Sequence, residues 1–320
     1  MFLFESIPWY SAMMWFGVVA GLMLVNELTR SSKWFSCLIY IIVPIILTLL
    51  VWPKTAGPNS STGTWFHWVK VYSSLAGVLG FMLLRYNKKA AANKYMLLFP
   101  PLILSVNILE AVVRDFQCYT LYSGSLFGSI INHVTMQGGA WNVMNGIAGI
   151  INIITISGWM GIFIGKDKHK DMLWPDQLWW WIIAYDLWNF AYVYNCVSDH
   201  SFYAGAALLV SCTIPAFLIG KGAWLQHRAQ TLATWMMFTM CFPVFVDDSI
   251  FAVKSSHHTS ALIVVSGLAL LVNVAVLVFH VYKIIRFKRN PLREEVYIDE
   301  SKYLEIAAKR GEVITLTEPE

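Results

Sequence analysis

Long apolar runs, separated by short polar loops, follow one another along almost the whole chain. A run of about 20 apolar residues, rising 1.5 Å per residue in an α-helix, crosses the hydrocarbon core of a bilayer, which is about 30 Å thick. The pattern predicts an all-α fold, a polytopic transmembrane helical bundle of about nine spans within residues 1–286. The predicted spans are 9–29, 34–52, 65–85, 95–115, 141–164, 174–197, 202–219, 229–251 and 259–284. Residues 287–320 are predicted to form a cytoplasmic C-terminal tail, in which ESKYLEIAAKRG forms a short helix that ends at Gly311.

The loops on the two sides of this predicted bundle differ in charge. One side holds the loops 30–33, 85–94, 166–170 and 221–228 and the start of the tail at 283–289. These segments contain fifteen lysines and arginines, whereas the other side contains only Lys54, Arg114 and Lys254. Basic loops stay in the cytoplasm, so the N-terminus is predicted outside and the C-terminus inside. A count of eight or ten spans would mix the two groups of loops.

The composition agrees with a multi-pass protein of the cell membrane. Of the 320 residues 57% are hydrophobic and 13% charged, and 15 Trp, 14 Tyr and 19 Phe are available for interfacial belts. The net charge of +4 comes from short loops, so the lipid bilayer is the expected partner and nucleic acid is not. The segment around Glu5 has no basic region, which favours a first span over a removable signal peptide.

Two features on the predicted outer side are less regular. Residues 117–141 are too apolar for a free loop and are interrupted by glycines, which predicts a re-entrant or interfacial helix. Cys118 and Cys196 are both expected on the outer side, where a disulfide can form, and the sequence leaves their pairing open.

Carboxylates within the apolar runs are the main functional signal. Asp186 lies near the middle of the span 174–197, and Asn189 follows three residues later on the same helical face. Pro243 precedes Asp247 and Asp248, which either cap the span at the interface or extend a path of acids from outside toward Asp186.

The fourth span has a similar pattern. Pro100 and Pro101 are expected to break it near its inner end, and Asn107, Glu110 and Arg114 then share one face. Carbonyls freed by proline, together with carboxylates, are hard oxygen ligands that suit Na⁺, Ca²⁺ or Mg²⁺. Glu110 either pairs with Arg114 or belongs to the path of acids.

Three further residues complete the predicted site. Lys70 is too deep in its span to be a plain interfacial anchor, so it either counters one of the acids or extends outward to the interface. Asn145 belongs to a stripe of asparagines that either bridges helices or lines the same cavity. Trp188 is too deep for an interfacial anchor, and with Tyr185 and Tyr192 it could form the wall of a pocket for an organic cation.

The sequence offers little support for an enzyme. The last span has no lysine in its interior to bind retinal, and the histidines do not have the spacing of a zinc site. Walker, GxSxG and CxxCH motifs are absent from the sequence. No cofactor is therefore predicted, beyond bound Na⁺, Ca²⁺ or H⁺.

Two segments resemble a known family. WIIAYDLWNFAYVYNCV (181–197) and HRAQTLATWMMFTMCFPVFVDDS (227–249) are similar to an uncharacterised family of prokaryotic polytopic membrane proteins, a domain of unknown function. This resemblance implies no activity.

Two functions follow as hypotheses. The first is a cation transporter or channel, with proton coupling through carboxylates, in which Asp186 and Asn189 form the central site. The second is a receptor-like membrane protein that binds a small organic ligand in an aromatic-lined pocket. A narrow path lined by carboxylates would favour the first hypothesis, and a closed aromatic chamber would favour the second.

Overall fold

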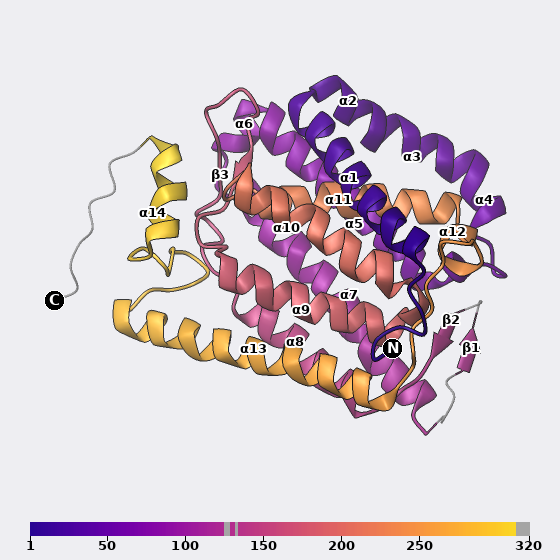
Figure 1. The fold of residues 1–320 in the computed structure, drawn as a ribbon. Helices are drawn as coiled ribbons and strands as arrows, with labels where there is room; N and C mark the ends of the chain where they lie inside the picture. The colour runs from indigo at the N-terminus through magenta and orange to yellow at the C-terminus, as the bar shows by residue number, and fades with distance from the viewer. Residues whose placement is uncertain (125–128, 132–133, 312–320) are drawn as a thin grey trace.

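The fold is described from a computed structural model, which covers residues 1–124, 129–131 and 134–311 (Figure 1). The long helices lie side by side in one bundle, and most of them run along the same direction. Over the predicted spans the helices are α1 (Trp9–Ser31), the continuous segment α2–η1–α3–η2–α4 (Lys33–Thr55), α5 (Trp65–Tyr86), η4 and α7 (Met96–Leu98 and Phe99–Tyr122), α8 (Ala140–Ile154), α9 (Trp179–Cys196), η5, η6 and α10 (Ser198–His200, Ser201–Ala207 and Leu208–Leu218), α11 (Trp224–Cys241) and α13 (Thr259–Phe287). The shorter elements are η3 (Ser61–Gly63), α6 (Lys88–Ala92), α12 (Val244–Asp247), α14 (Ser301–Ala307) and η7 (Ala308–Arg310).

The all-α class is confirmed, and each predicted span lies at least partly on a helix. In the described part of the chain, six of these helices are long and apolar enough to cross a membrane. They are α1, the segment Lys33–Thr55, α5, Met96–Tyr122, Ser198–Leu218 and α13. The number of crossings and the side on which each terminus lies remain predictions.

The surface of the bundle is apolar on several of its outer helices. Leu24 of α1 is 61% exposed, Leu49 of η2 is 69% exposed and Leu271 of α13 is 67% exposed. By contrast, α9 has most of its side chains buried and packs against α7, α8, α10 and α13. Polar residues inside and leucines outside are the distribution expected for a protein surrounded by lipid.

The two ends of the bundle are distinct in Figure 1. α6, β3 (Phe163–Ile164) and α14 lie at one end, called here the basic end, whereas α4 and α12 lie at the opposite end. Contacts join the loops at the basic end: the Arg30 guanidinium donates to the Asp171 carboxylate at 2.9–3.1 Å, and Arg85 Nη2 donates to the carbonyl oxygens of Arg30 and His169. Three of the basic loops grouped by the charge pattern, 30–33, 85–94 and 166–170, therefore meet in space.

Residues 117–141 do not form the expected helix. α7 continues to Tyr122, and the described residues beyond it form a hairpin in which β1 (Ser129–Ile131) pairs antiparallel with β2 (Val134–Met136). Residues 125–128 and 132–133 lie outside the described part. The glycines that interrupt this apolar segment favour a turn over a helix.

The fifth predicted span ends too late. α8 stops at Ile154, and residues Phe163–Ile164 pair instead with β4 (Met172–Leu173). The following helix α9 begins at Trp179 rather than at 174, so Asp176 lies in the loop before it.

The two proline positions behave differently. Pro100 and Pro101 lie in the first turn of α7, where the backbone N–H groups have no intrahelical acceptor in any case, so the expected kink at Pro100 is wrong. At Pro243 the expected discontinuity is present, since α11 ends at Cys241 and α12 begins at Val244.

The described part of the tail packs on the basic end. Asp176 accepts hydrogen bonds from the backbone N–H groups of Val296 (2.8 Å) and Tyr297 (3.1 Å) and from the Ser157 hydroxyl (2.7 Å). Burial raises the pKa of Asp176 to about 6 although these hydrogen bonds oppose the shift. The predicted tail helix is confirmed as α14 and η7, and Gly311 ends it in the left-handed conformation at φ 78°.

Candidate functional site

A cavity of about 60 Å³ lies inside the bundle, enough for about four water molecules. It is enclosed by side chains of α5, α7, α9, the segment η5–α10 and α11. They are Phe66, His67, Lys70, Asn107, Ala111, Tyr185, Asn189, Tyr192, Val193, Val197, His200, Ala204, Leu208, Arg228, Leu232, Trp235, Met236 and Thr239. These lining residues include one arginine, one lysine and two histidines, and none of them is an Asp or Glu.

Helical spacing explains why α9 and α11 present polar groups to this cavity. On α9, Tyr185, Asn189 and Tyr192 follow at i, i+4 and i+7 and therefore share one face. On α11, Arg228 and Trp235 are also seven residues apart. Two helical faces thus provide most of the polar and aromatic wall.

Arg228 is the most unusual member of the wall. Its side chain is buried, its Nε donates to the Tyr185 hydroxyl (3.3 Å) and its Nη2 donates to Asn189 Oδ1 (3.2 Å). The guanidinium also lies 5.8 Å from the centre of the Tyr185 ring, within cation–π range. Nη1 has no hydrogen-bond partner among the described residues. A buried guanidinium therefore faces the cavity with one nitrogen free and with neutral partners on the others.

Lys70 is the second cation, and its charge is balanced. Its Nζ lies 2.7 Å from Glu110 Oε2 and donates to the backbone oxygen and to Oδ1 of Asn107 at 2.9 and 3.3 Å. The Ser73 hydroxyl donates to the same Glu110 oxygen. Lys70 is therefore the counter-ion of Glu110, and Arg114 is not.

The two histidines of the cavity wall, His67 and His200, lie toward the end of the bundle that is opposite to the basic end. His200 Nε2 is 3.0 Å from Asp247 Oδ1, and the Ser61 hydroxyl donates to the other oxygen of Asp247 at 2.7 Å. The rings of His67 and His200 are 6.0 Å apart. Asp247 thus supports the cavity wall from behind, whereas Asp248 is exposed and outside it.

Asp186 lies beside the cavity rather than on its wall. Its Oδ2 accepts from the Thr213 hydroxyl at 2.7 Å, and the Trp224 indole N–H donates to the same hydroxyl oxygen at 3.2 Å. Its Oδ1 is shielded from solvent and has no partner among the described residues. Asp186 forms no ion pair with the nearby Arg228, because none of its carboxylate oxygens lies within 4 Å of a guanidinium nitrogen in the described part of the chain.

Asn145 and Trp188 belong to a different part of the bundle. The Trp188 indole N–H donates to the backbone oxygen of Asn145 at 3.1 Å, where α8 and α9 pack closely at Gly149. Asn145 Nδ2 donates to the buried carboxylate of Asp115 at 2.7 Å. These residues bridge helices and do not line the cavity.

Asp115 was not among the predicted site residues. It is fully buried and accepts hydrogen bonds from Asn142, Asn145 and the Cys196 thiol. Cys118 and Cys196 are both buried free thiols. The stripe of asparagines on α8 was the sequence signal for this buried carboxylate. A carboxylate without a cationic partner needs neutral hydrogen-bond donors, and asparagine amides supply them.

Sequence reasoning also missed Arg228, His67 and His200. Arg228 was assigned to a loop because the eighth span was predicted to begin at residue 229. The helix α11 begins at Trp224, so Arg228 lies one turn inside it.

No group of three or more His, Cys, Asp or Glu side chains in the described part of the chain is arranged to hold a metal ion.

Comparison with known proteins gives a family without an activity. No curated protein and no solved structure matches the chain. The family model of DUF5692, a family of unknown function, matches residues 5–309. The expected membership in an uncharacterised family is thereby confirmed. The chain belongs to DUF5692.

Proposed function

We propose that this chain is a multi-pass protein of the cell membrane that binds a small organic solute with a negatively charged group in the cavity at Arg228. The N-terminus would lie outside and the C-terminus in the cytoplasm, as the basic loops indicate. The proposal shares with the second sequence hypothesis a ligand pocket with aromatic walls, but it assigns the ligand the opposite charge.

The observation that carries the proposal is the buried guanidinium of Arg228, a residue that lines the cavity and whose Nη1 has no hydrogen-bond partner among the described residues. An arginine side chain keeps its charge in any protein environment, so burial cannot be relieved by loss of a proton. A buried charge without an ionic partner is costly, and an incoming carboxylate or phosphate would supply both the counter-charge and the missing acceptor.

The rest of the wall suits the organic part of such a solute. Phe66, Tyr192 and Trp235 provide aromatic surface, and the Tyr192 hydroxyl has no hydrogen-bond partner among the described residues. The cavity of about 60 Å³ limits the solute to the size of formate or acetate.

Ligand binding can be measured on the purified full-length protein in detergent by thermal melting. The probes are formate, acetate and inorganic phosphate, which suit a cavity of about 60 Å³, with methylammonium as the cationic comparison. We expect acetate to raise the melting temperature and Arg228→Gln to raise the acetate Kd about tenfold or more, since charge-assisted hydrogen bonds are lost. Arg114→Gln is the matched control, because Arg114 is also buried but does not line the cavity.

A stronger response to methylammonium than to acetate, or full acetate binding by Arg228→Gln, would refute the anion site. Flux of radiolabelled acetate into proteoliposomes then separates a carrier, which moves the solute, from a receptor, which only binds it.

Cation transport is the second candidate, and the free Oδ1 of Asp186 is the observation that favours it. Asp186 and Asn189 would form the central site, with Na⁺, Ca²⁺ or H⁺ as the ion. In proteoliposomes, Asp186→Asn should abolish such a flux, because an amide keeps the volume but neither loses a proton nor neutralises a cation. Full flux in this variant would exclude Asp186 as the ion site.

A further inference from the structure

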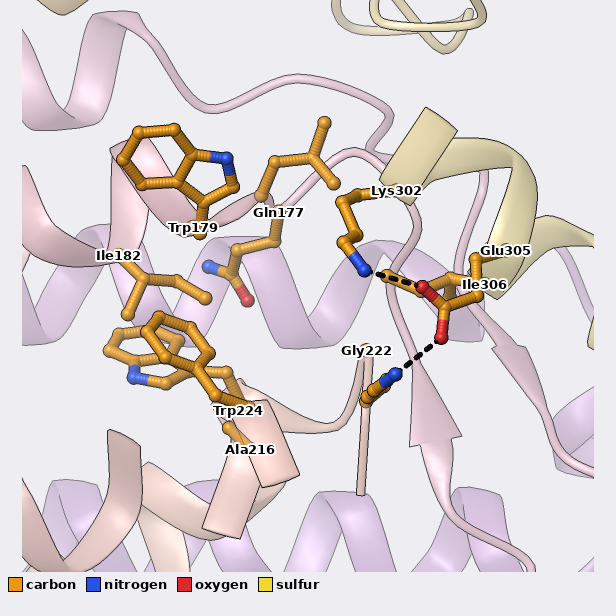
Figure 2. Close-up of a pocket in the computed structure, with 12 residues that line it drawn as sticks. Gln177, Trp179, Ile182, Ala216, Gly222, Trp224, Lys302, Glu305 and Ile306 are labelled. Atoms are coloured by element: carbon orange, nitrogen blue, oxygen red, sulfur yellow. Dashed lines mark hydrogen bonds and ion pairs between the residues drawn. The ribbon is translucent and has the colours of Figure 1, made fainter. Parts of the chain in front are cut away.

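A second pocket, of about 360 Å³, lies at the basic end between α9, α10 and the tail helix α14 (Figure 2). Its volume is within the range of small-molecule sites, about 300–1,000 Å³. The proposed solute site at Arg228 shares no lining residue with it.

The interior of this pocket is apolar with a single free acceptor. Trp179, Ile182 and Phe217 are among the residues that line it. The Gln177 side chain extends into the same space in Figure 2, and its Oε1 is buried and has no hydrogen-bond donor among the described residues.

The mouth of the pocket holds two lysines on one carboxylate. Glu305 of α14 lies 2.6 Å from Lys221 Nζ and 2.9 Å from Lys302 Nζ, and Figure 2 shows the pair of Lys302 and Glu305. Lys221 and Lys302 lower the pKa of Glu305 to about 2. The carboxylate of the protein's own tail therefore occupies the position where two cations converge.

The surface beside the pocket is apolar. Trp179 is 56% exposed, and Leu218 and Ile219 at the end of α10 are 75% and 57% exposed. Exposed apolar side chains next to lysines are typical of the boundary between acyl chains and headgroups.

We propose that this pocket binds an anionic lipid of the membrane leaflet at the basic end. The acyl chain would lie along Trp179 and Ile182, and the phosphate would bind Lys221 and Lys302 in place of the Glu305 carboxylate. The apolar interior, the convergent lysines and the adjoining apolar surface are all explained by this one ligand. Binding would then displace the Glu305 carboxylate from Lys221 and from Lys302, which belongs to α14 itself, so the glutamate and the lipid phosphate compete for the same two cations.

The test uses the full-length protein in detergent and counts bound lipid by native mass spectrometry. The probes are phosphatidylglycerol, phosphatidylcholine and the water-soluble glycerol phosphate. We expect phosphatidylglycerol to bind about tenfold more tightly than phosphatidylcholine, and the double variant Lys221→Gln/Lys302→Gln to remove this preference. Both lysines are largely exposed, so these changes leave the fold intact.

Glu305→Gln provides the sharper arm, because it removes the competing carboxylate without removing a cation. It should strengthen phosphatidylglycerol binding severalfold, whereas the control Glu294→Gln, at an exposed tail carboxylate, should not. Lys88→Gln is the matched control for loss of an exposed lysine at the same end.

Three outcomes would overturn the proposal. They are equal binding of phosphatidylglycerol and phosphatidylcholine, unchanged lipid preference in the double lysine variant, and glycerol phosphate binding as tight as that of phosphatidylglycerol. The last outcome would mean that the apolar interior does not contribute.

Discussion

The buried ion pair of Lys70 and Glu110 offers the most direct test of the structure. The two side chains are 9% and 11% exposed, and Nζ lies 2.7 Å from Oε2. Lys70→Met would leave the Ser73 hydroxyl, at 3.2 Å, as the remaining hydrogen-bond donor to the Glu110 carboxylate among the described residues. Loss of one partner from a buried pair costs about 3–5 kcal/mol, because the other charge is left without compensation.

The double variant Lys70→Met/Glu110→Met should recover most of this loss, because it removes both buried charges. We expect it to be about 3 kcal/mol more stable than the sum of the two single effects predicts. The free energy of unfolding can be measured by reversible titration with SDS, with melting temperature as a second readout.

The exposed pair Lys221–Glu305 is the matched control. It is as short, 2.6 Å, but its side chains are 42% and 37% exposed. Lys221→Met should therefore cost less than about 1 kcal/mol. If the single variants of both pairs cost the same, or if the buried pair shows additive effects, then Lys70 and Glu110 are not packed away from solvent as described.

Two further predictions concern local energetics. Because burial raises the pKa of Asp176 to about 6, the folded protein binds this proton more tightly than the unfolded chain does. Stability should therefore fall by up to about 3 kcal/mol as pH rises from 4 to 7, and melting curves of Asp176→Asn should lack this component. A Cβ at Gly149 would lie 2.5 Å from Val112 Cγ2 of α7 and 2.7 Å from Trp188 Nε1 of α9, so Gly149→Ala should cost about 1–3 kcal/mol in SDS titration. Gly21→Ala, where nothing lies within 4 Å, should stabilise α1 by about 0.5–1 kcal/mol, and the opposite order would contradict the packing of α8 on α7 and α9.

The helices could be predicted from the sequence because a run of apolar residues is a local property. The sequence alone did not reveal where such a run stops being helical. Residues 155–164 continue the apolar pattern after α8, yet Phe163–Ile164 pair with Met172–Leu173, a contact that depends on the intervening loop. Apolar character predicts burial or lipid contact, and it does not separate a helix end from a short hairpin.

The candidate site was predicted only in part, because the face of one helix is a local property of the sequence and the contacts between helices are not. Spacing along one helix placed Asn107 and Glu110 on a common face, and the depth of Lys70 indicated a need for an acid. Which acid it meets depends on how α5 packs on α7, and in the sequence Arg114 was the alternative partner of Glu110. Partners across helices are set by packing, whereas faces of a helix are set by period.

The buried polar groups fall into two classes, and the difference bears on function. Arg114 and Arg228 are both buried, and each has one nitrogen without a hydrogen-bond partner among the described residues. Arg114 donates to Gln117 and to the Met136 sulfur and lies outside the cavity lining, so no ligand can reach its free Nε through the cavity. Arg228 has the same electrostatic deficit but adjoins open volume with aromatic walls. An unsatisfied donor alone is a cost to the fold, whereas an unsatisfied cation beside a cavity is a cost that a ligand can remove. For this reason we propose the anion site at Arg228 and use Arg114 as its control.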